Sequence, residues 1–210
     1  MSEAKETVFI VDDDRSVLKA LQRLLAASGL EVASFDSPQA FLEHYDCAVP
    51  GCLVLDVAMP GLNGLELQQE LAARGGALPI VFLTGHGDVP MSVQAMKRGA
   101  VDFLTKPVDE KDLLAAIRSS FERGRRLRAA QAELAEIGRR LATLTPRERE
   151  VLQHIVAGRR NKQVAGDLGI VEKTIKVHRA RVMEKMQAES LAELVRIAER
   201  AGIRGTPSRD

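Results

Sequence analysis

Polar side chains that could react or bind a metal follow four apolar segments of this 210-residue chain. Asp12 and Asp13 follow one segment, and Asp56, Thr84 and Lys106 each end or follow another. Three carboxylates that lie close together repel one another unless a cation neutralises them, and oxygen ligands suit a hard ion such as Mg2+. With an ammonium and a hydroxyl group added, such a cluster suits a phosphoryl group, which a carboxylate could attack in line.

The segments that carry these residues are predicted to be buried strands. Apolar runs occupy residues 7–11, 31–35, 52–56, 79–83 and 101–104. A stretch with helical features follows each run, and five such repeats predict a parallel sheet with helices on both faces. Asp after a strand is more often an ordinary turn residue than a nucleophile. A reactive site therefore requires that these side chains lie close together in the folded chain. We expect this because ligands bind outside the carboxyl ends of parallel strands.

The two halves of the chain differ in charge. Residues 1–123 contain 11 Lys and Arg against 18 Asp and Glu, whereas residues 124–210 contain 19 against 11. This asymmetry predicts an acidic domain joined to a basic domain that could bind nucleic acid. A solvated basic helix surface is the alternative interpretation.

Nothing in the sequence resembles a signal peptide or a membrane span. We therefore expect a cytoplasmic protein with no membrane partner. Cys47 and Cys52 are the only cysteines, and with His44 they match no common zinc spacing. Buried or idle thiols are expected, not a disulfide framework.

The first part of the chain resembles the receiver domains of two-component response regulators. The likeness rests on the acidic pair, on Met-Pro-Gly-x-x-Gly shortly after Asp56, on Thr-Gly-His-Gly-Asp-Val-Pro-Met from Thr84, and on Phe-Leu-Thr-Lys-Pro around Lys106. It implies that residues 1–121 form a flavodoxin-like α/β receiver domain, with a five-stranded parallel sheet in the order 2-1-3-4-5.

The same resemblance implies a role for each residue of the acidic cluster. Asp56 would accept a phosphoryl group from a sensor histidine kinase, and Lys106 would contact that group. Asp13 would bind Mg2+ directly and Asp12 through water, together with Asp56 and the backbone carbonyl of Ala58.

Four neighbouring residues receive further interpretations. Thr84 and Phe103 resemble the family's switch pair, in which the Thr hydroxyl turns to the phosphoryl group and the aromatic ring turns inward behind it. Unlike Tyr, Phe has no hydroxyl, so any coupling must come from packing. By composition, Phe103 is equally consistent with an ordinary core residue. We hypothesise that His86 influences the lifetime of the phosphoaspartate, with a simple loop residue as the alternative. Asp14 is interpreted as a cap for the first helix.

Helical periodicity continues from about residue 109 into a predicted helical linker at 122–142. An apolar seam with spacings of three and four comprises Leu127, Ala130, Leu134, Ile137 and Leu141. Two heptads are few for an independent coiled coil, so packing against a domain is a competing interpretation. Gly124 is expected to be a weak point or hinge.

Residues 143–201 are predicted to form four short helices. Thr145 and Glu148 make a capping box at the first, Asn161 is expected to cap the second, and Ser190 opens the fourth. Helices joined by a brief Gly-containing turn suggest a helix-turn-helix. The tail at 202–210 is expected to be disordered.

The third of these helices separates an apolar face from a basic one. Ile175, Val182 and Met186 share the face directed to the core, and the opposite face could enter a DNA major groove. Lys162 and Arg179 are expected on phosphates. The residues predicted to contact DNA are Lys162, Lys173, Thr174, Lys176, Val177, Arg179, Ala180 and Arg181.

Three stretches of this region resemble the all-α four-helix DNA-binding domain of the LuxR, NarL and FixJ regulators. They are Leu-Thr-Pro-Arg-Glu-Arg-Glu-Val-Leu, Asn-Lys-x-Val-Ala from Asn161, and Glu-Lys-Thr-Ile-Lys-Val-His-Arg from Glu172. With its receiver, the whole chain resembles the FixJ subgroup. Val171 departs from the usual Ser before the recognition helix, and a missing N-cap costs about 1 kcal/mol.

These resemblances imply a phosphorylation-activated transcription factor, without enzyme activity beyond slow loss of its own phosphoryl group. Phosphorylation of Asp56 would favour a surface around residues 89–103 that forms a homodimer or frees the basic domain. The expected partners are the sensor histidine kinase, an inverted repeat in double-stranded promoter DNA, and RNA polymerase.

Three other functions are less well supported. The intact acidic cluster argues against a DNA-binding regulator that ignores phosphorylation. An enzyme with an aspartyl-phosphate intermediate would have Asp-x-Asp, whereas Val-Ala follows Asp56. The capped helix-turn-helix argues against an RNA-binding antiterminator.

Overall fold

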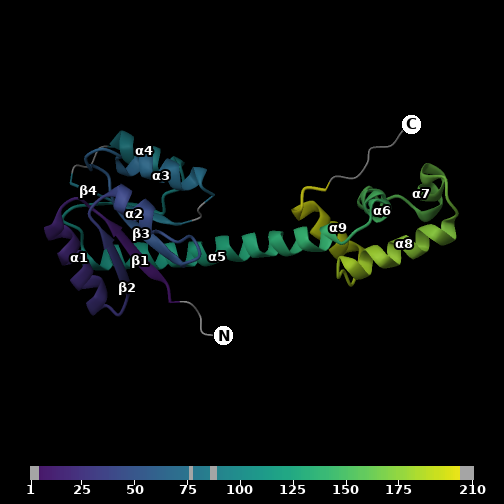
Figure 1. Cartoon of the computed structure of the whole chain (residues 1–210), viewed down its shortest axis with the longest axis horizontal. Helices are drawn as coiled ribbons and strands as arrows, with labels where there is room; N and C mark the ends of the chain where they lie inside the picture. The colour runs from purple at the N-terminus through teal and green to yellow at the C-terminus, as the bar shows by residue number, and fades with distance from the viewer. Residues whose placement is uncertain (1–4, 76–77, 86–88, 204–210) are drawn as a thin grey trace. The chain divides into compact units, whose positions relative to one another are not determined.

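The chain folds into two compact units, Met1–Arg128 and Ala129–Asp210, in the computed structural model (Figure 1). The residues that the structure describes are 5–75, 78–85 and 89–203. His86 and most of the predicted tail lie outside them. Among the described residues, no helix is both long and apolar enough to cross a membrane.

The first unit contains a five-stranded parallel sheet in the predicted order, β2-β1-β3-β4-β5. Its strands are β1 (Thr7–Val11), β2 (Glu31–Phe35), β3 (Gly51–Asp56), β4 (Ile80–Thr84) and β5 (Asp102–Thr105). Every residue of β3 is buried, which explains the nearly continuous apolar run before Asp56.

Helices cover both faces of this sheet and close two separate cores. They are α1 (Arg15–Ala27), α2 (Pro38–His44), α3 (Gly64–Ala73), α4 (Val89–Lys97) and α5 (Glu110–Ala142). α1 and the first part of α5 pack on one face, where Leu25 and Ile117 are fully buried. α2, α3 and α4 pack on the other, around Phe41 and Leu67. The predicted two-sided parallel sheet is thus confirmed.

α5 continues unbroken through Gly124, the position expected to be a weak point. Gly124 is buried, and a Cβ atom there would lie 3.4 Å from the side chain of Pro79. Arg125 and Arg128 beside it both bind the Glu6 carboxylate, at 2.6 and 3.1 Å. Gly124 thus lies within a continuous helix that packs in the first unit.

The second unit contains the four predicted short helices and the end of α5. The helices are α6 (Pro146–Val156), α7 (Asn161–Leu168), α8 (Glu172–Lys185) and α9 (Leu191–Arg200). Their shared core includes Val151, Ile155, Ile175, Val182, Met186 and Leu194.

The apolar seam of α5 joins this core only near its C-terminal end. Ile137 is 4% exposed and Leu141 is half-buried, whereas Leu134 is 50% exposed. Packing against a domain therefore accounts for the last part of the seam.

Side-chain caps begin α6 and α9. Thr145 and Glu148 form the predicted capping box at α6. At α9, the Ser190 hydroxyl accepts a hydrogen bond from the Glu193 backbone N–H at 3.2 Å. These caps fix the first turn of each helix.

α7 and α8 begin without a side-chain cap. Asn161 is the first residue of α7, so the prediction that it caps this helix is wrong; Arg160 holds the cap position. Val171 precedes α8 and makes no capping hydrogen bond, as its apolar side chain requires. Gly169 ends α7 in the left-handed conformation, at a φ of 63°.

A buried carboxylate joins α6 to the end of α8. Glu148 is 2% exposed and accepts hydrogen bonds from Lys185 Nζ at 2.7 Å and from the Thr145 backbone N–H at 2.9 Å. These bonds favour the charged form and lower the pKa of Glu148 to about 2. Lys185 also donates to the Thr143 carbonyl at 3.1 Å.

This ion pair predicts acid sensitivity of the second unit. Because the pKa of Glu148 is lower in the folded state than in the unfolded state, its stabilisation is present above the unfolded pKa and is lost as pH falls toward about 2. Glu148→Gln should cost roughly 1–3 kcal/mol at neutral pH and should flatten the loss of stability in that acid range.

Urea titrations of the full chain, followed by amide NMR signals of α6 and α8, measure this effect. Glu150→Gln is the control, because Glu150 is an exposed carboxylate of the same helix, paired with Arg147. Equal acid sensitivity of wild type and Glu148→Gln would contradict the prediction.

Candidate functional site

Three carboxylates meet at the carboxyl edge of the sheet, as the sequence predicts. β1 and β3 are hydrogen-bonded neighbours, with Val11 opposite Leu55, so the residues that follow them lie side by side. One carboxylate oxygen each from Asp12, Asp13 and Asp56 lies within 4.8 Å of the others. Asp12 and Asp56 are 1% and 5% exposed, whereas Asp13 is exposed.

Lys106 reaches these carboxylates from the loop after β5. Its Nζ donates hydrogen bonds to Asp12 Oδ2 at 2.5 Å and to Asp56 Oδ1 at 2.8 Å. Burial disfavours the ammonium, but these bonds outweigh burial and raise the pKa of Lys106 above its ordinary value. Burial raises the pKa of Asp12, although Lys106 favours its charged form. One ammonium thus binds two of the three carboxylates, and the cluster keeps an excess of negative charge.

Backbone N–H groups hold the second oxygens of the two buried carboxylates. Asp56 Oδ2 accepts a hydrogen bond from the Ala58 N–H, and Asp12 Oδ1 accepts one from the Asp14 N–H, both at 3.0 Å. The Asp14 carboxylate accepts from the Ser16 N–H at 2.7 Å and caps α1, which confirms its interpretation. Both buried carboxylates therefore have fixed orientations.

Gly64 lets α3 begin directly against the strand end that carries Asp56. Its N–H donates to the Val57 carbonyl at 3.1 Å. A Cβ atom at Gly64 would lie only 2.4 Å from the Asp56 carbonyl oxygen and 3.2 Å from the Phe82 ring. Any side chain here must displace the backbone that presents Asp56.

Thr84 and Phe103 lie on neighbouring strands of the same unit. Thr84 is 2% exposed at the end of β4, and its carbonyl accepts a hydrogen bond from the Lys106 N–H at 2.7 Å. Phe103 is half-buried on β5, and its ring centroid lies 6.0 Å from that of Phe82. Their joint switching remains a prediction, as does the effect of His86, which lies outside the described residues.

The donor set fits a hard divalent cation. Three carboxylate oxygens within bridging distance of one another are ligands that Mg2+ prefers. The Ala58 carbonyl, the predicted fourth ligand, belongs to the same turn because its own N–H binds Asp56. The excess negative charge of the cluster also favours a cation there.

In the second unit, α8 shows the predicted separation of faces. Ile175, Val182 and Met186 are fully buried. Thr174 and Arg179 are half-buried. The exposed residues among the predicted DNA contacts are Lys173, Lys176, Val177, Ala180 and Arg181 on α8, and Lys162 on α7. The exposed face thus combines basic groups with small side chains, which allow close approach to a groove.

An acidic cluster with a lysine at the carboxyl edge of a parallel sheet, in one chain with a helix-turn-helix unit, is the combination expected of a response regulator with a DNA-binding domain. The family model for "Response regulator receiver domain" matches residues 8–118. The model for "Bacterial regulatory proteins, luxR family" matches residues 142–198.

Several known proteins align with nearly the whole of this chain. Nodulation protein W of Bradyrhizobium diazoefficiens is 47% identical, over 96% of this chain and 89% of that protein. The transcriptional regulatory protein FixJ of Azorhizobium caulinodans is 49% identical, over 93% of each chain. The solved structure of the response regulator StyR is 48% identical, covers 93% of this chain and 99% of its own, and gives a TM-score of 0.81.

The chain belongs to the FixJ-type response regulators, which combine a receiver domain with a LuxR-type DNA-binding domain. It is a phosphorylation-activated transcriptional regulator of a two-component system.

The contacts that position the functional groups are not evident from the sequence alone. The glycine spacing after Asp56 contains Gly64, but only the fold shows which backbone atom it approaches. Lys185 lies at the end of the basic helix, and its charge alone does not predict a buried partner. Its spacing from Ile175 and Val182 could have predicted one, because that spacing places Lys185 at the edge of the buried face of the helix.

The close approach at Gly64 predicts that Gly64→Ala weakens Mg2+ binding, since the added methyl group displaces the turn carrying Asp56 and Ala58. We expect the Mg2+ affinity to fall about tenfold, the lower end of the loss seen when groups that orient metal ligands are disturbed. Amide NMR during Mg2+ titration of the full chain measures it. Gly138→Ala is the matched control, because a Cβ atom there meets nothing within 4 Å. Unchanged Mg2+ affinity in Gly64→Ala would contradict the prediction.

Proposed function

We propose that Asp56 is the phosphoacceptor of this regulator and receives its phosphoryl group from a histidine of a sensor kinase. The observation that supports this role is the fixed, buried Asp56 carboxylate, with one oxygen on Lys106 and the other on the Ala58 N–H. A carboxylate held in this way attacks from a defined direction and loses little conformational entropy when it reacts.

In the proposed transfer, an Asp56 oxygen forms a bond to phosphorus while the bond from phosphorus to the kinase histidine nitrogen breaks. Asp12, Asp13, Asp56 and the Ala58 carbonyl would hold Mg2+, which offsets charge on the phosphoryl oxygens when bound. Lys106 would shift its hydrogen bond from Asp56 to a phosphoryl oxygen. The chain is thus an acceptor that later loses the group slowly, and it turns over no other substrate.

The proposed response to phosphorylation is self-association through α4. Val89, Val93 and Met96 form an apolar stripe on this helix and are 71%, 46% and 46% exposed. Such a stripe at helical spacing suits burial against a second copy. Thr84 and Phe103 would link the phosphorylated edge to this surface.

The proposed output is binding of a homodimer to an inverted repeat in promoter DNA, where it would contact RNA polymerase. Lys173, Thr174, Lys176, Val177, Ala180 and Arg181 would face the major groove, with Lys162 and Arg179 on phosphates. The exposure of this face, with its basic and small residues, supports the assignment.

The phosphoacceptor role predicts that Asp56→Asn abolishes phosphorylation. Wild type incubated with a small-molecule phosphodonor and Mg2+ should gain one phosphoryl group by intact mass, and Asp56→Asn should gain none. Asp36→Asn is the matched control, because Asp36 follows strand β2 of the same sheet and pairs with Arg15 at the surface. Modification of Asp56→Asn at the wild-type rate would reject Asp56 as the acceptor.

The phosphate contact predicted for Lys162 has a separate signature. Lys162→Ala should reduce the slope of log affinity against log salt by about 0.9 and weaken binding to all duplexes alike. Fluorescence anisotropy at several salt concentrations measures the slope. Lys111→Ala removes a lysine from the receiver unit and should leave the slope unchanged. A changed sequence preference in Lys162→Ala would instead indicate contact with base edges.

A further inference from the structure

The recognition helix α8 begins without a side-chain cap, whereas side chains from α5 and α6 bind its C-terminal end. Val171, which precedes the helix, is 68% exposed and makes no capping bond. Ile175 is the buried anchor of the first turns, whereas Val182 and Met186 are both fully buried near the end. Lys185 adds the ion pair with Glu148. Contacts at its C-terminal end therefore help to fix the direction of the helix.

Arg140, near the end of α5, supplies one of these contacts. Its Nη1 donates a hydrogen bond to the Met186 carbonyl at 3.2 Å, and its Nε donates to the Glu136 carboxylate at 3.0 Å. The Arg140 side chain is 24% exposed. Residue 140 precedes the stretch at 142–198 that matches the LuxR-type family. The contact therefore comes from the predicted linker.

The backbone that Arg140 holds is strained. Gln187, directly after Met186, has a φ of 52°, in the left-handed region that glycine normally occupies. The helix ends there through hydrogen bonds from the Gln187 N–H to the Glu184 carbonyl and from the Ala188 N–H to the Met183 carbonyl, each 3.0 Å. A residue without glycine's freedom keeps this conformation only when its surroundings fix it. The bond from Arg140 to the preceding carbonyl is such a constraint.

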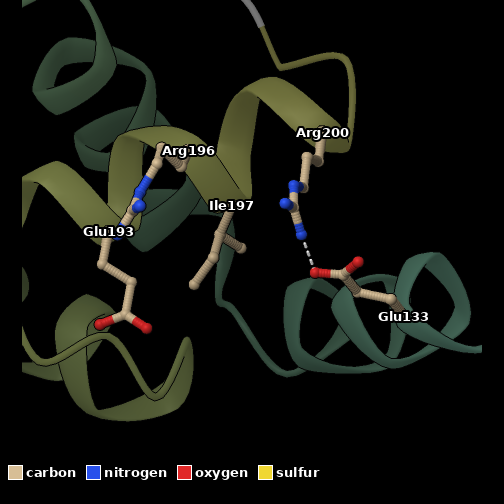
Figure 2. Close-up of a pocket in the computed structure, with 5 residues that line it drawn as sticks. All are labelled: Glu133, Glu193, Arg196, Ile197 and Arg200. Atoms are coloured by element: carbon tan, nitrogen blue, oxygen red, sulfur yellow. Dashed lines mark hydrogen bonds and ion pairs between the residues drawn. The ribbon is translucent and has the colours of Figure 1, made fainter. Parts of the chain in front are cut away.

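The end of α5 is a firm support for Arg140. Ile137 is buried in the core of the second unit, and Arg149 donates to the Leu141 carbonyl at 3.1 Å. Glu133 pairs with Arg200 of α9 beside Ile197, at the edge of a cavity of about 240 Å³ (Figure 2). Contacts on two sides thus fix this segment of α5 to α6 and α9.

We propose that Arg140 is a positioning residue for DNA recognition, which sets the direction of α8 by holding the strained turn after it. This inference rests on the proposed function of the α8 face. A 14-residue helix is about 21 Å long, so a tilt of about 10° at one end moves the other by roughly 4 Å. Such a movement exceeds the tolerance of hydrogen bonds to base edges.

The test compares Arg140→Ala with Arg139→Ala in the full chain, with every protein, wild type included, activated by a phosphate mimic plus Mg2+. Arg139 is the matched control because it lies on the same helix, also pairs with Glu136 and is 75% exposed. The two probes are a duplex selected by wild type from a random-sequence pool and a random duplex of equal length. Arg140→Ala should lose about tenfold in affinity for the selected duplex, with little change for the random duplex and an unchanged salt slope. Arg139→Ala should match wild type.

A second substitution separates positioning from charge. Gln187→Gly relieves the strain at the turn, so it should restore most of the lost affinity in the Arg140→Ala background. A direct contact of Arg140 with DNA would lower the salt slope and would not be rescued. Amide NMR signals of α6 and α7 report whether each variant is folded, and Arg140→Lys offers a milder change if Arg140→Ala unfolds.

Several outcomes would overturn the proposal. They are equal losses in Arg139→Ala and Arg140→Ala, equal losses on both duplexes, a lowered salt slope, or no rescue by Gln187→Gly in a folded protein. Failure of wild type to select any duplex would instead remove the proposed DNA function itself, so the two failures are distinguishable.

Discussion

The sharing of one ammonium by two buried carboxylates is the interaction on which the first unit depends. The buried carboxylates of Asp12 and Asp56 repel each other, and Lys106 Nζ bridges them with hydrogen bonds of 2.5 and 2.8 Å. The cluster is held together and yet keeps an excess of negative charge. Such an arrangement favours a bound cation, and we expect it to rearrange when an Asp56 oxygen becomes part of an acyl phosphate.

The rest of that unit supports this balance. A parallel sheet covered on both faces brings the ends of β1 and β3 together, and the close approach at Gly64 fixes the turn after Asp56. Lys106 follows the edge strand β5 and is tied by its backbone to the end of β4. A change at Asp56, the proposed phosphoacceptor, would therefore reach β4 and β5 directly. Those strands carry Thr84 and Phe103, the residues proposed to act as the switch.

The sequence predicted most of this architecture because its signals are local and repeated. Five apolar runs with helical stretches between them define the sheet, and capping residues such as Thr145 and Ser190 mark helix starts. The failures concern residues whose role depends on distant atoms. For Gly124, expected to be a weak point, the sequence could not show that Pro79 lies against it within a continuous helix. Asn is a residue type that often caps helices, but Asn161 is itself the first residue of α7, and Arg160 holds the cap position.

Charge patterns in the sequence predicted exposed faces but not long-range partners. They correctly indicated the basic exposed face of α8, because a periodic helix separates its faces in sequence. They could not show that Lys185 binds a buried carboxylate or that Arg140 binds a carbonyl, since the partners are 37 and 46 residues away. The second unit consequently depends on polar contacts at helix ends that only the fold brings together.

The central claim is that phosphorylation at Asp56 controls binding to DNA. Its most direct test is selection of genomic DNA fragments by the full chain, with wild type activated by a phosphate mimic plus Mg2+ and with Asp56→Asn treated identically. The account predicts that only activated wild type enriches a shared inverted repeat. Equal enrichment of the same repeat by both proteins would contradict it, because DNA binding would then not depend on the receiver.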